Sequence, residues 1–353
     1  MVQQQIMKAE ILLTRRCNLT CKTCAMIKQH KPELTLDQWK EAFRIVFEDL
    51  GGDFVALYGG EPLMLRDKLV DIVEYLSTFR SKGKDFTVIS NCIGLERSFM
   101  QRLMEAGLQS WTASVDGFAV SDYYDSNSQQ KSGIGYRKLR EFKDMGLRDC
   151  CGIFTITKKN IRDLPAVITE LSREGIWTGF DFVHYDKGND FVGHSRFNAT
   201  RAEIGEDVLF SLKNSEDREI ITSVMNEVAR LKREGAMVFP SFEAIEKLSN
   251  PWVSAGLTWN CKYPASITID CDGSLGGCDD YPGKNIEKWS IFDLAGRARW
   301  AEFVEVYKRD VENCYGCAWS THILACQFVD EQGNLLSDKA REYYQHKACG
   351  GEF

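Results

Sequence analysis

Three cysteines lie close together near the start of the chain, at Cys17, Cys21 and Cys24. Three thiolates cannot complete a four-iron, four-sulfur (4Fe–4S) cluster, because full protein ligation takes four of them. A cluster held in this way would keep one iron free to bind another molecule. The alternative is a zinc site completed by a distant histidine such as His30, since zinc takes four nitrogen, sulfur or oxygen ligands. The spacing predicts a metal site and leaves the metal open.

The whole chain has 13 cysteines, an odd number, and no apolar signal segment follows its first residues. Disulfide frameworks are typical of secreted chains, so this cysteine usage favours metal binding. Seven of the cysteines lie between Cys261 and Cys349, which predicts a second metal region. The others are scattered at Cys92, Cys150 and Cys151, where the usual role of a free cysteine is that of a small buried apolar residue.

The elements that must position the first cysteines alternate between strands and helices over residues 9–183. Helices are expected between the strands, such as 36–50, which opens with a capping box of Thr35 and Gln38, and 161–174. No glycine-rich dinucleotide fingerprint follows the first strand, so the pattern favours an α/β fold of the partial (β/α)6 TIM-like barrel type. The cysteines would then lie at the carboxyl end of the sheet, where ligands bind. The predicted strands are 10–14, 54–58, 86–90, 110–115, 152–157 and 178–183.

The length of 353 residues predicts two packed units. We expect the partial barrel over residues 1–190, a helical connector over 191–250, and a small Cys-rich auxiliary-cluster domain over 251–353. The net charge of −7 offers no general binding surface for a polyanion, so nucleic acid is not expected as a partner. No apolar run reaches the roughly 18 residues that would span a bilayer. We therefore expect no membrane partner and a cytoplasmic location.

The motif C-x3-C-x2-C after the first strand resembles the signature of the radical S-adenosylmethionine (AdoMet) superfamily, also called radical SAM. About forty residues further on, Tyr58-Gly-Gly-Glu-Pro62 resembles the glycine-glycine-glutamate-proline motif of the same family. The resemblance implies that the first three cysteines hold a 4Fe–4S cluster and that Gly59, Gly60 and Glu61 bind the amino group of AdoMet. One departure is Thr23, at a position where an aromatic residue is frequent in the family.

Polar residues at later strand ends extend the resemblance. Ser90 and Asn91 follow the third predicted strand, and Ser114 and Asp116 end the fourth. The family uses such side chains to hold the ribose and the carboxylate of AdoMet. The alternative is that they are ordinary caps and turns, since serine, asparagine and aspartate are common there. Residues 157–160 resemble a recurring thr-lys-x-asn stretch of the superfamily.

The second cysteine region resembles the auxiliary-cluster extension called SPASM, or its shortened version called twitch. Two arrangements remain open because the pattern departs from a full SPASM motif after Cys317. The favoured one has two auxiliary 4Fe–4S clusters, and the other has a single cluster on Cys261, Cys278, Cys314 and Cys317. In the favoured arrangement one cluster is held by Cys314, Cys317, Cys326 and Cys349. The other is held by Cys261, Cys271 and Cys278, with Asp330 as a candidate fourth ligand.

The resemblance implies an enzyme that reductively cleaves AdoMet to a 5′-deoxyadenosyl radical, which takes hydrogen from an unactivated C–H bond. The leading hypothesis is oxidation or cross-linking of a peptide or protein residue, with flavodoxin or ferredoxin as electron donor. Asp279 is the candidate catalytic base, and a solvated acidic turn is its alternative. The second hypothesis is dehydrogenation or epimerisation of a sugar, aminocyclitol or other small molecule. The early first strand leaves no room for an N-terminal leader-binding domain, which weakens the peptide hypothesis, and a zinc-stabilised binding protein is the non-enzymatic alternative.

Overall fold

A computed structural model of the protein describes the following parts of the chain: residues 6–22, 24, 30–118, 126–183, 205, 207–211, 214–249, 263–277, 285–312 and 334. Within these parts the fold is α/β, with one sheet of eight strands in the order β6-β5-β4-β3-β2-β1-β7-β8. The strands β1 to β7 run parallel to one another, and β8 is antiparallel to β7. The strands are β1 (Lys8–Thr14), β2 (Phe54–Gly59), β3 (Asp85–Ser90), β4 (Ser110–Ser114), β5 (Asp149–Ile156), β6 (Trp177–Phe182), β7 (Ser266–Ile269) and β8 (Leu275–Gly276).

The helices follow the strands in βα order, as the sequence predicts. The α-helices are α1 (Leu36–Arg44), α2 (Asp67–Ser77), α3 (Arg97–Glu105), α4 (Ser126–Asp144), α5 (Leu164–Arg173), α7 (Ser215–Arg233), α8 (Phe242–Leu248) and α9 (Trp300–Val311). One π-helical turn, η2 (Ile45–Asp49), continues α1. Short 3-10 turns are η3 (Pro62–Leu65), η4 (Arg80–Lys82), η5 (Ile161–Asp163), η6 (Ile286–Lys288) and η7 (Ile291–Arg297).

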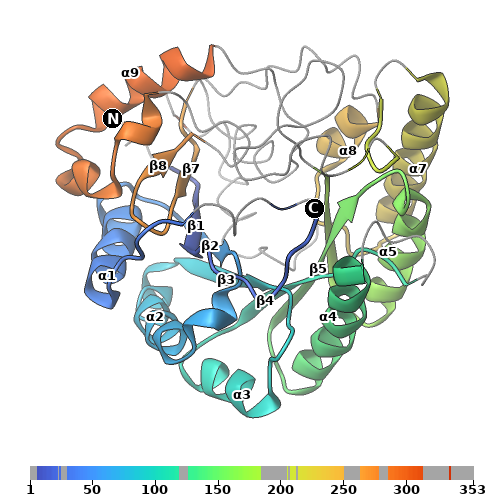
Figure 1. Cartoon of the computed structure of the whole chain (residues 1–353), viewed down its shortest axis with the longest axis horizontal. Coiled ribbons are helices and arrows are strands. Elements are labelled where there is room, and N and C mark those ends of the chain that lie inside the picture. The colour runs from blue at the N-terminus through green and yellow to red at the C-terminus, as the bar shows by residue number, and fades with distance from the viewer. Residues whose placement is uncertain are drawn as a thin grey trace.

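The strands stand in the middle of the molecule and helices α1 to α5 surround them on the outside (Figure 1). The sheet does not close, since β6 and β8 form its two edges. This is the partial TIM-like barrel that the alternation of strands and helices predicts. The predicted capping box of Thr35 and Gln38 is present and starts α1. The predicted helix over 161–174 begins as η5 and continues as α5.

The two faces of the strands differ in chemistry because successive side chains point to opposite sides. On β1, Ala9, Ile11 and Leu13 belong to the main apolar core, which lies between the sheet and the helices. Leu12 points the other way and contacts Tyr58 and Cys24 in a separate small cluster. The inner face of the barrel therefore leads towards the first cysteines.

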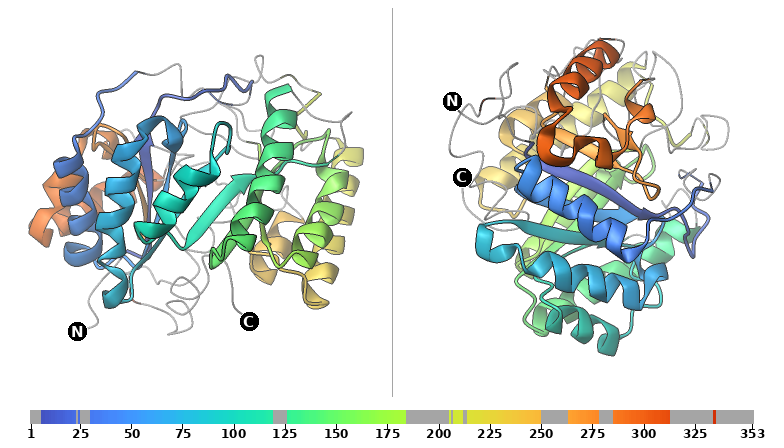
Figure 2. Two further views of the ribbon diagram at one scale, coloured as in Figure 1. Left: turned by 90° about the horizontal axis from the view of Figure 1, so that it is seen from below. Right: turned by 90° about the vertical axis from the view of Figure 1, so that its left-hand side faces the viewer.

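Segments that are far apart in the sequence lie side by side. Strand β7 pairs with β1, with Lys8 opposite Ser266 and Ile11 opposite Ile269. The C-terminal strands and α9, drawn in orange, accordingly lie against the blue N-terminal elements in both views of Figure 2. The sequence predicts a separate small domain for residues 251–353, and the described part of that segment contributes two strands to the barrel sheet. The division into domains stays a prediction.

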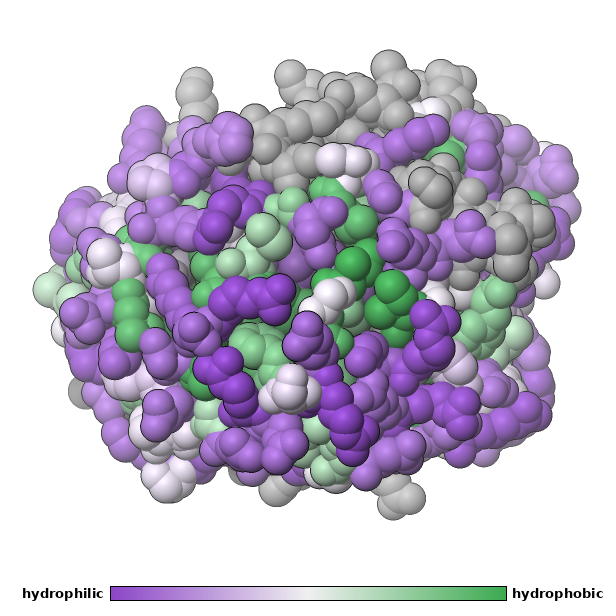
Figure 3. Space-filling view, turned by 60° about the horizontal axis from the view of Figure 1, so that its bottom comes forward, coloured by the Kyte–Doolittle hydropathy of each residue, from purple (hydrophilic) through white to green (hydrophobic). Residues whose placement is uncertain are grey.

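The outer surface is mostly hydrophilic on the face shown in Figure 3, where purple residues surround smaller green patches. Among the described residues the large apolar side chains that are exposed are Met64, Phe118 and Phe242. None of the described helices is long and apolar enough to cross a membrane.

Candidate functional site

The predicted site residues that the structure describes gather at the carboxyl ends of β1 to β4. Cys17, Gly60, Asn91 and Asp116 lie in the loops that follow these strands. Parallel strands put these loops at one edge of the sheet, which is where α/β barrels bind ligands. The structure thus brings the first cysteine cluster and the predicted AdoMet-binding loops together.

Two glycines let the loop after β2 pack directly against the entry to the cysteines. The backbone N–H of Gly60 donates to the carbonyl of Thr14 at 2.7 Å, and that of Glu61 donates to the carbonyl of Arg16 at 2.8 Å. A Cβ atom on Gly59 would stand 2.3 Å from the Thr14 oxygen, and one on Gly60 would stand 2.1 Å from the Arg16 oxygen. Only glycine fits such a close backbone approach. Both glycines are half-buried, so a ligand can still reach this backbone.

The Glu61 side chain points into the protein and is 1% exposed. Its oxygens accept hydrogen bonds from Ser90 Oγ at 2.7 Å, the Asn91 backbone N–H at 2.8 Å and the Leu63 backbone N–H at 3.1 Å. Burial raises the pKa of Glu61, and these three donors oppose that rise. A carboxylate has about four acceptor positions, so these three donors leave about one unused. Glu61 therefore ties the loop after β2 to the end of β3.

Asn91 links the end of β3 to the loop that carries the cysteines. Its side-chain Nδ2 donates to Asn18 Oδ1 at 2.8 Å and lies 3.9 Å from the sulfur of Cys17. Asn18 in turn donates to the carbonyl of Ile93 at 3.2 Å. Asn18, inside the cysteine motif, was not among the predicted site residues. A polar residue between metal-ligating cysteines is the signal that could have indicated it.

The three cysteines are chemically suited to the 4Fe–4S cluster that the family resemblance implies, and their role as its ligands stays a prediction. Cys17, Cys21 and Cys24 are each partly exposed and none forms a disulfide. The Cys17 sulfur accepts the backbone N–H of Leu19 at 3.4 Å, and hydrogen bonds to sulfur are a feature of cluster sites. Within the described ranges no three His, Cys, Asp or Glu side chains are close enough to share one metal ion. In a 4Fe–4S cluster each thiolate binds its own iron, so the thiolates need not converge on one point.

Asp116 lies in the loop after β4, at the same carboxyl ends of the strands. Asp116 is fully buried, forms an ion pair with Lys131 at 2.9 Å and accepts the backbone N–H of Thr155 at 2.9 Å. Asn160 donates to the Asp116 carbonyl at 3.0 Å. These bonds hold the loop after β4 against α4 and β5. Ser114, by contrast, is half-buried, and AdoMet contact by Ser114 and Asp116 stays a prediction.

Cys150, Cys151 and Cys271 lie outside the loops that follow β1 to β4. Cys150 packs in the core between the sheet and the helices, where burial raises the pKa of its thiol to about 12. Cys151, the next residue on β5, is also buried but does not belong to that core cluster. Cys271 is fully buried beside β7. The remaining predicted residues lie outside the described part of the chain: Cys261, Cys278, Asp279, Cys314, Cys317, Cys326, Asp330 and Cys349.

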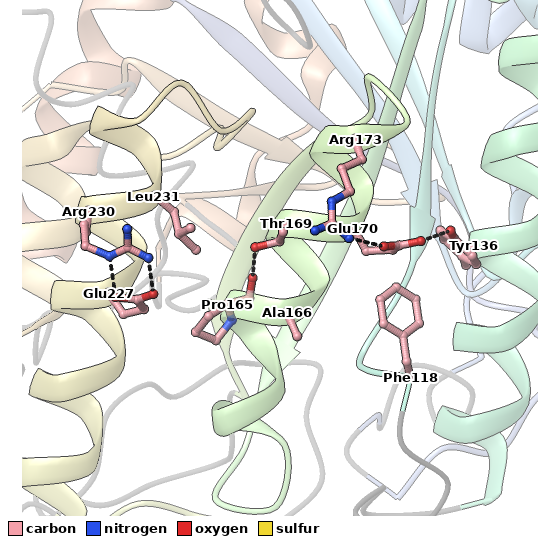
Figure 4. A pocket seen from close by; sticks show the side chains of 10 residues that line it. All are labelled: Phe118, Tyr136, Pro165, Ala166, Thr169, Glu170, Arg173, Glu227, Arg230 and Leu231. Carbon is pink, nitrogen blue, oxygen red and sulfur yellow. Dashed lines mark hydrogen bonds and ion pairs between the residues drawn. The ribbon is translucent and has the colours of Figure 1, made fainter.

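A surface groove is lined by side chains of three helices and by Phe118, which follows Asp116 by two residues (Figure 4). Its walls come from α4, α5 and α7, with Tyr136 and Leu231 among the lining residues. Its charged residues pair with neighbours in the groove: Glu227 with Arg230 at 2.6 Å and Glu170 with Arg173 at 3.4 Å. The groove contains none of the predicted site residues, so it is not the candidate site.

Comparison with known proteins gives a family match over the part of the chain that forms this site. Residues 11–171 match the family model of the Radical SAM superfamily. Among curated proteins, pre-heme d1 synthase of Dinoroseobacter shibae is 31% identical over 228 residues, which are 60% of this chain and 53% of that protein. The chain spans about half the length of the curated relatives it matches.

Solved structures share the fold at low sequence identity. Streptococcus suis SuiB bound to S-adenosylmethionine has a TM-score of 0.59 and 13% identity, covering 85% of this chain and 66% of SuiB. The enzyme anSMEcpe with bound AdoMet and Cp18Cys peptide has a TM-score of 0.56 and 17% identity, covering 89% of this chain and 86% of that chain. At this level of identity the likenesses show a shared fold over most of the chain, beyond the matched family segment.

Proposed function

Residues 11–171 belong to the radical SAM superfamily, and from this premise we propose that the chain is an AdoMet-cleaving enzyme that modifies a peptide or protein residue. The superfamily implies AdoMet and a 4Fe–4S cluster. One structural observation supports the assignment of this function to particular residues. The loop with Cys17, Cys21 and Cys24 lies in backbone contact with the Gly59–Gly60 loop, where a Cβ atom would collide with the backbone before Cys17.

In this proposal each group at the strand ends has a separate task. The three cysteines hold the cluster, and the half-buried backbone of Gly59 and Gly60 receives the amino group of AdoMet. Glu61 fixes that backbone and provides the remaining acceptor position. When bound, the cluster and AdoMet supply the one-electron chemistry that removes hydrogen from an unactivated carbon. Ser90, Asn91, Ser114 and Asp116 line or support the remaining contacts of AdoMet.

The C-terminal part of the proposal rests on the sequence pattern. One or two auxiliary 4Fe–4S clusters on the cysteines between 261 and 349 would take up the electron that a substrate radical loses. Asp279 would act as the base that removes the proton in the same oxidation. A flavodoxin or ferredoxin would supply the reducing electron to the first cluster.

Two substrate classes have support from different comparisons. The anSMEcpe structure contains a peptide and covers most of both chains, which favours a peptide or protein residue. The second candidate is a small molecule, since the relative with 31% identity is named a pre-heme d1 synthase. A tetrapyrrole therefore joins the sugar and aminocyclitol class as a compound to test.

The test measures 5′-deoxyadenosine by mass spectrometry after anaerobic reconstitution with iron and sulfide, reduction by dithionite and addition of AdoMet. We expect the nucleoside from the natural chain and none from Cys17→Ala, Cys21→Ala or Cys24→Ala. Cys150→Ala is the matched control, because it removes a cysteine that packs in the core, and it should keep the activity. Cleavage that survives loss of any of the first three cysteines contradicts the cluster assignment.

The same assay decides between the substrates. Candidate peptides and porphyrins are added in separate reactions. The substrate belongs to the class that accelerates the release of 5′-deoxyadenosine and whose own mass changes during the reaction. Acceleration by porphyrins alone would overturn the peptide proposal and leave the AdoMet chemistry in place.

A further inference from the structure

Both ends of the segment that carries the first cysteines contact one turn from the C-terminal part of the chain. We call residues 15–34 the cysteine loop and residues 270–274, between β7 and β8, the β7–β8 turn. Arg15 enters the cysteine loop directly after β1, and Lys31 and Leu34 leave it before α1. All three of these residues bond to the β7–β8 turn, although more than 230 positions separate them from it along the chain.

The entry contact is a buried ion pair. Arg15 Nε donates to Asp270 Oδ1 at 3.1 Å, and a second guanidinium nitrogen donates to Oδ2. Arg15 is 5% exposed and Asp270 is fully buried. A two-point contact between guanidinium and carboxylate fixes orientation as well as distance. The position of Arg15, two residues before Cys17, is thus set by a residue of the C-terminal segment.

The exit contact uses the same carboxylate. Lys31 Nζ lies 3.1 Å from Asp270 Oδ2 and 2.9 Å from Asp272 Oδ2, and it donates to Ser274 Oγ at 2.8 Å. The backbone N–H of Leu34 donates to the carbonyl of Cys271 at 2.8 Å. Asp270 therefore bonds to both ends of the cysteine loop at once.

The turn is itself well fixed, so it can serve as a reference point. The Asp270 backbone N–H donates to the carbonyl of Ser274 at 2.9 Å, and that of Gly273 donates to the carbonyl of Asp270 at 2.8 Å. The Asp270 carboxylate also accepts the backbone N–H of Cys271 at 2.7 Å. Before the turn, β7 is paired in register with β1 as far as Ile269. The paired strand before Asp270 and the hydrogen bonds within the turn together fix the position of the Asp270 carboxylate.

We infer that Asp270 is a positioning residue for the AdoMet-binding cluster, because it anchors both ends of the cysteine loop to the C-terminal segment. The role in AdoMet binding rests on the proposed function, whereas the anchoring of the loop rests on the contacts of Asp270 with Arg15 and Lys31. It makes the β7–β8 turn part of the first cluster site. Loss of the carboxylate removes the anchor that Arg15 and Lys31 share and leaves the loop that carries Cys17, Cys21 and Cys24 more weakly held.

The test compares two variants that each break a buried ion pair. Asp270→Asn keeps an acceptor for the Cys271 N–H and removes the charge that Arg15 and Lys31 share. Asp53→Asn is the matched control: Asp53 is 3% exposed and pairs with Lys84 at 2.8 Å, immediately before β2 and therefore at the amino ends of the strands. Both variants lose a buried charge, and only the first touches the cysteine loop.

Hydrogen–deuterium exchange of the full chain without cofactors is the first readout, because it needs no bound cluster. We expect Asp270→Asn to raise amide exchange over residues 16–24 and 30–34 by about tenfold or more, and Asp53→Asn to leave it unchanged. The second readout is the change that AdoMet causes in the electron paramagnetic resonance spectrum of the reduced cluster. Asp270→Asn should weaken this AdoMet response by a similar factor, and Asp53→Asn should keep it.

Equal exchange in the two variants, or a full AdoMet response in Asp270→Asn, would overturn the inference. If Asp270→Asn fails to fold, Arg15→Met with Asp270→Asn removes both charges together, and such replacements are often tolerated. The double variant must show the same faster loop exchange. If the natural chain gives no AdoMet response at all, the proposed function fails, while the exchange result still decides whether Asp270 holds the loop.

Discussion

Replacing Gly60 by alanine should disturb the candidate site more than its small size suggests. The added Cβ would stand 2.1 Å from the carbonyl oxygen of Arg16, 2.6 Å from its carbonyl carbon and 2.8 Å from that of Arg15. Real Cβ contacts essentially never fall below 3.0 Å. All three contacts are with backbone, so no side-chain rotation can relieve them. The backbone before Cys17 must move by about 1 Å.

Two magnitudes follow from that displacement. Overpacking of this kind costs about 1–3 kcal/mol in the free energy of unfolding. A shift of about 1 Å in reacting groups can lower a rate about a hundredfold, and Cys17 is the next residue after the displaced carbonyl. We therefore expect Gly60→Ala to unfold at lower denaturant concentration and to release much less 5′-deoxyadenosine after reconstitution.

The control is Gly133→Ala in α4, where the new Cβ meets only a guanidinium nitrogen of Arg137 at 3.6 Å. Alanine is about 1 kcal/mol better than glycine inside a helix, so this variant should be slightly stabilised. Urea unfolding of the chain without cofactors gives the stability difference, and the nucleoside assay gives the effect on chemistry. The reasoning is refuted if Gly60→Ala matches the natural chain in both measurements.

Two further variants test single groups. Glu61→Gln replaces an oxygen that accepts the Asn91 backbone N–H with an NH2 donor, and it should lower the free energy of unfolding in urea by about 1–3 kcal/mol. Glu74→Gln, on the exposed face of α2, should change it by almost nothing. An unchanged midpoint for Glu61→Gln would mean that its hydrogen bonds contribute nothing to the fold. Burial raises the pKa of Tyr263 to about 12, so above pH 10 the unfolded chain releases a proton that the folded chain keeps, and stability falls as the pH rises through this range. Tyr263→Phe should remove up to roughly 3 kcal/mol of this loss in the free energy of unfolding, at about 1.4 kcal/mol per pKa unit. Absorbance at 295 nm should show one tyrosine fewer that titrates late. An identical pH dependence of stability in the two proteins would contradict this prediction.

Local sequence patterns predicted the barrel well because each strand and helix carries its own signal. All six predicted strands are present, and the strand predicted from residue 110 is β4, which begins at Ser110. The helix face of Leu164, Val167, Ile168 and Leu171 is fully buried, as its period of 3.6 residues indicates. The predicted helix over 36–50 continues as a π-helical turn from Ile45, which apolar periodicity does not distinguish from an α-helix.

Contacts between distant parts of the chain were not predictable in the same way. The sequence indicates short pieces after residue 251, and β7 has only four residues, Ser266–Ile269. Nothing in so short a run specifies that it pairs with β1, because register and partner depend on the assembled sheet. The Arg15–Asp270 pair follows from that pairing, so it too could not be seen before the fold was known.

Residue type alone also could not separate ligand-binding groups from positioning groups at the strand ends. Glu61, Asp116 and Asp270 follow three different strands, and each is buried and bonded to backbone or to cations of the same chain. The cysteines and Ser114 at the same edge are partly exposed. A carboxylate can fix a loop only where water is kept away from its hydrogen bonds, whereas a ligand contact requires access. Burial and bonding partners therefore indicate which carboxylates fix these loops, and Glu61 is the one that we propose also offers an acceptor position to the ligand.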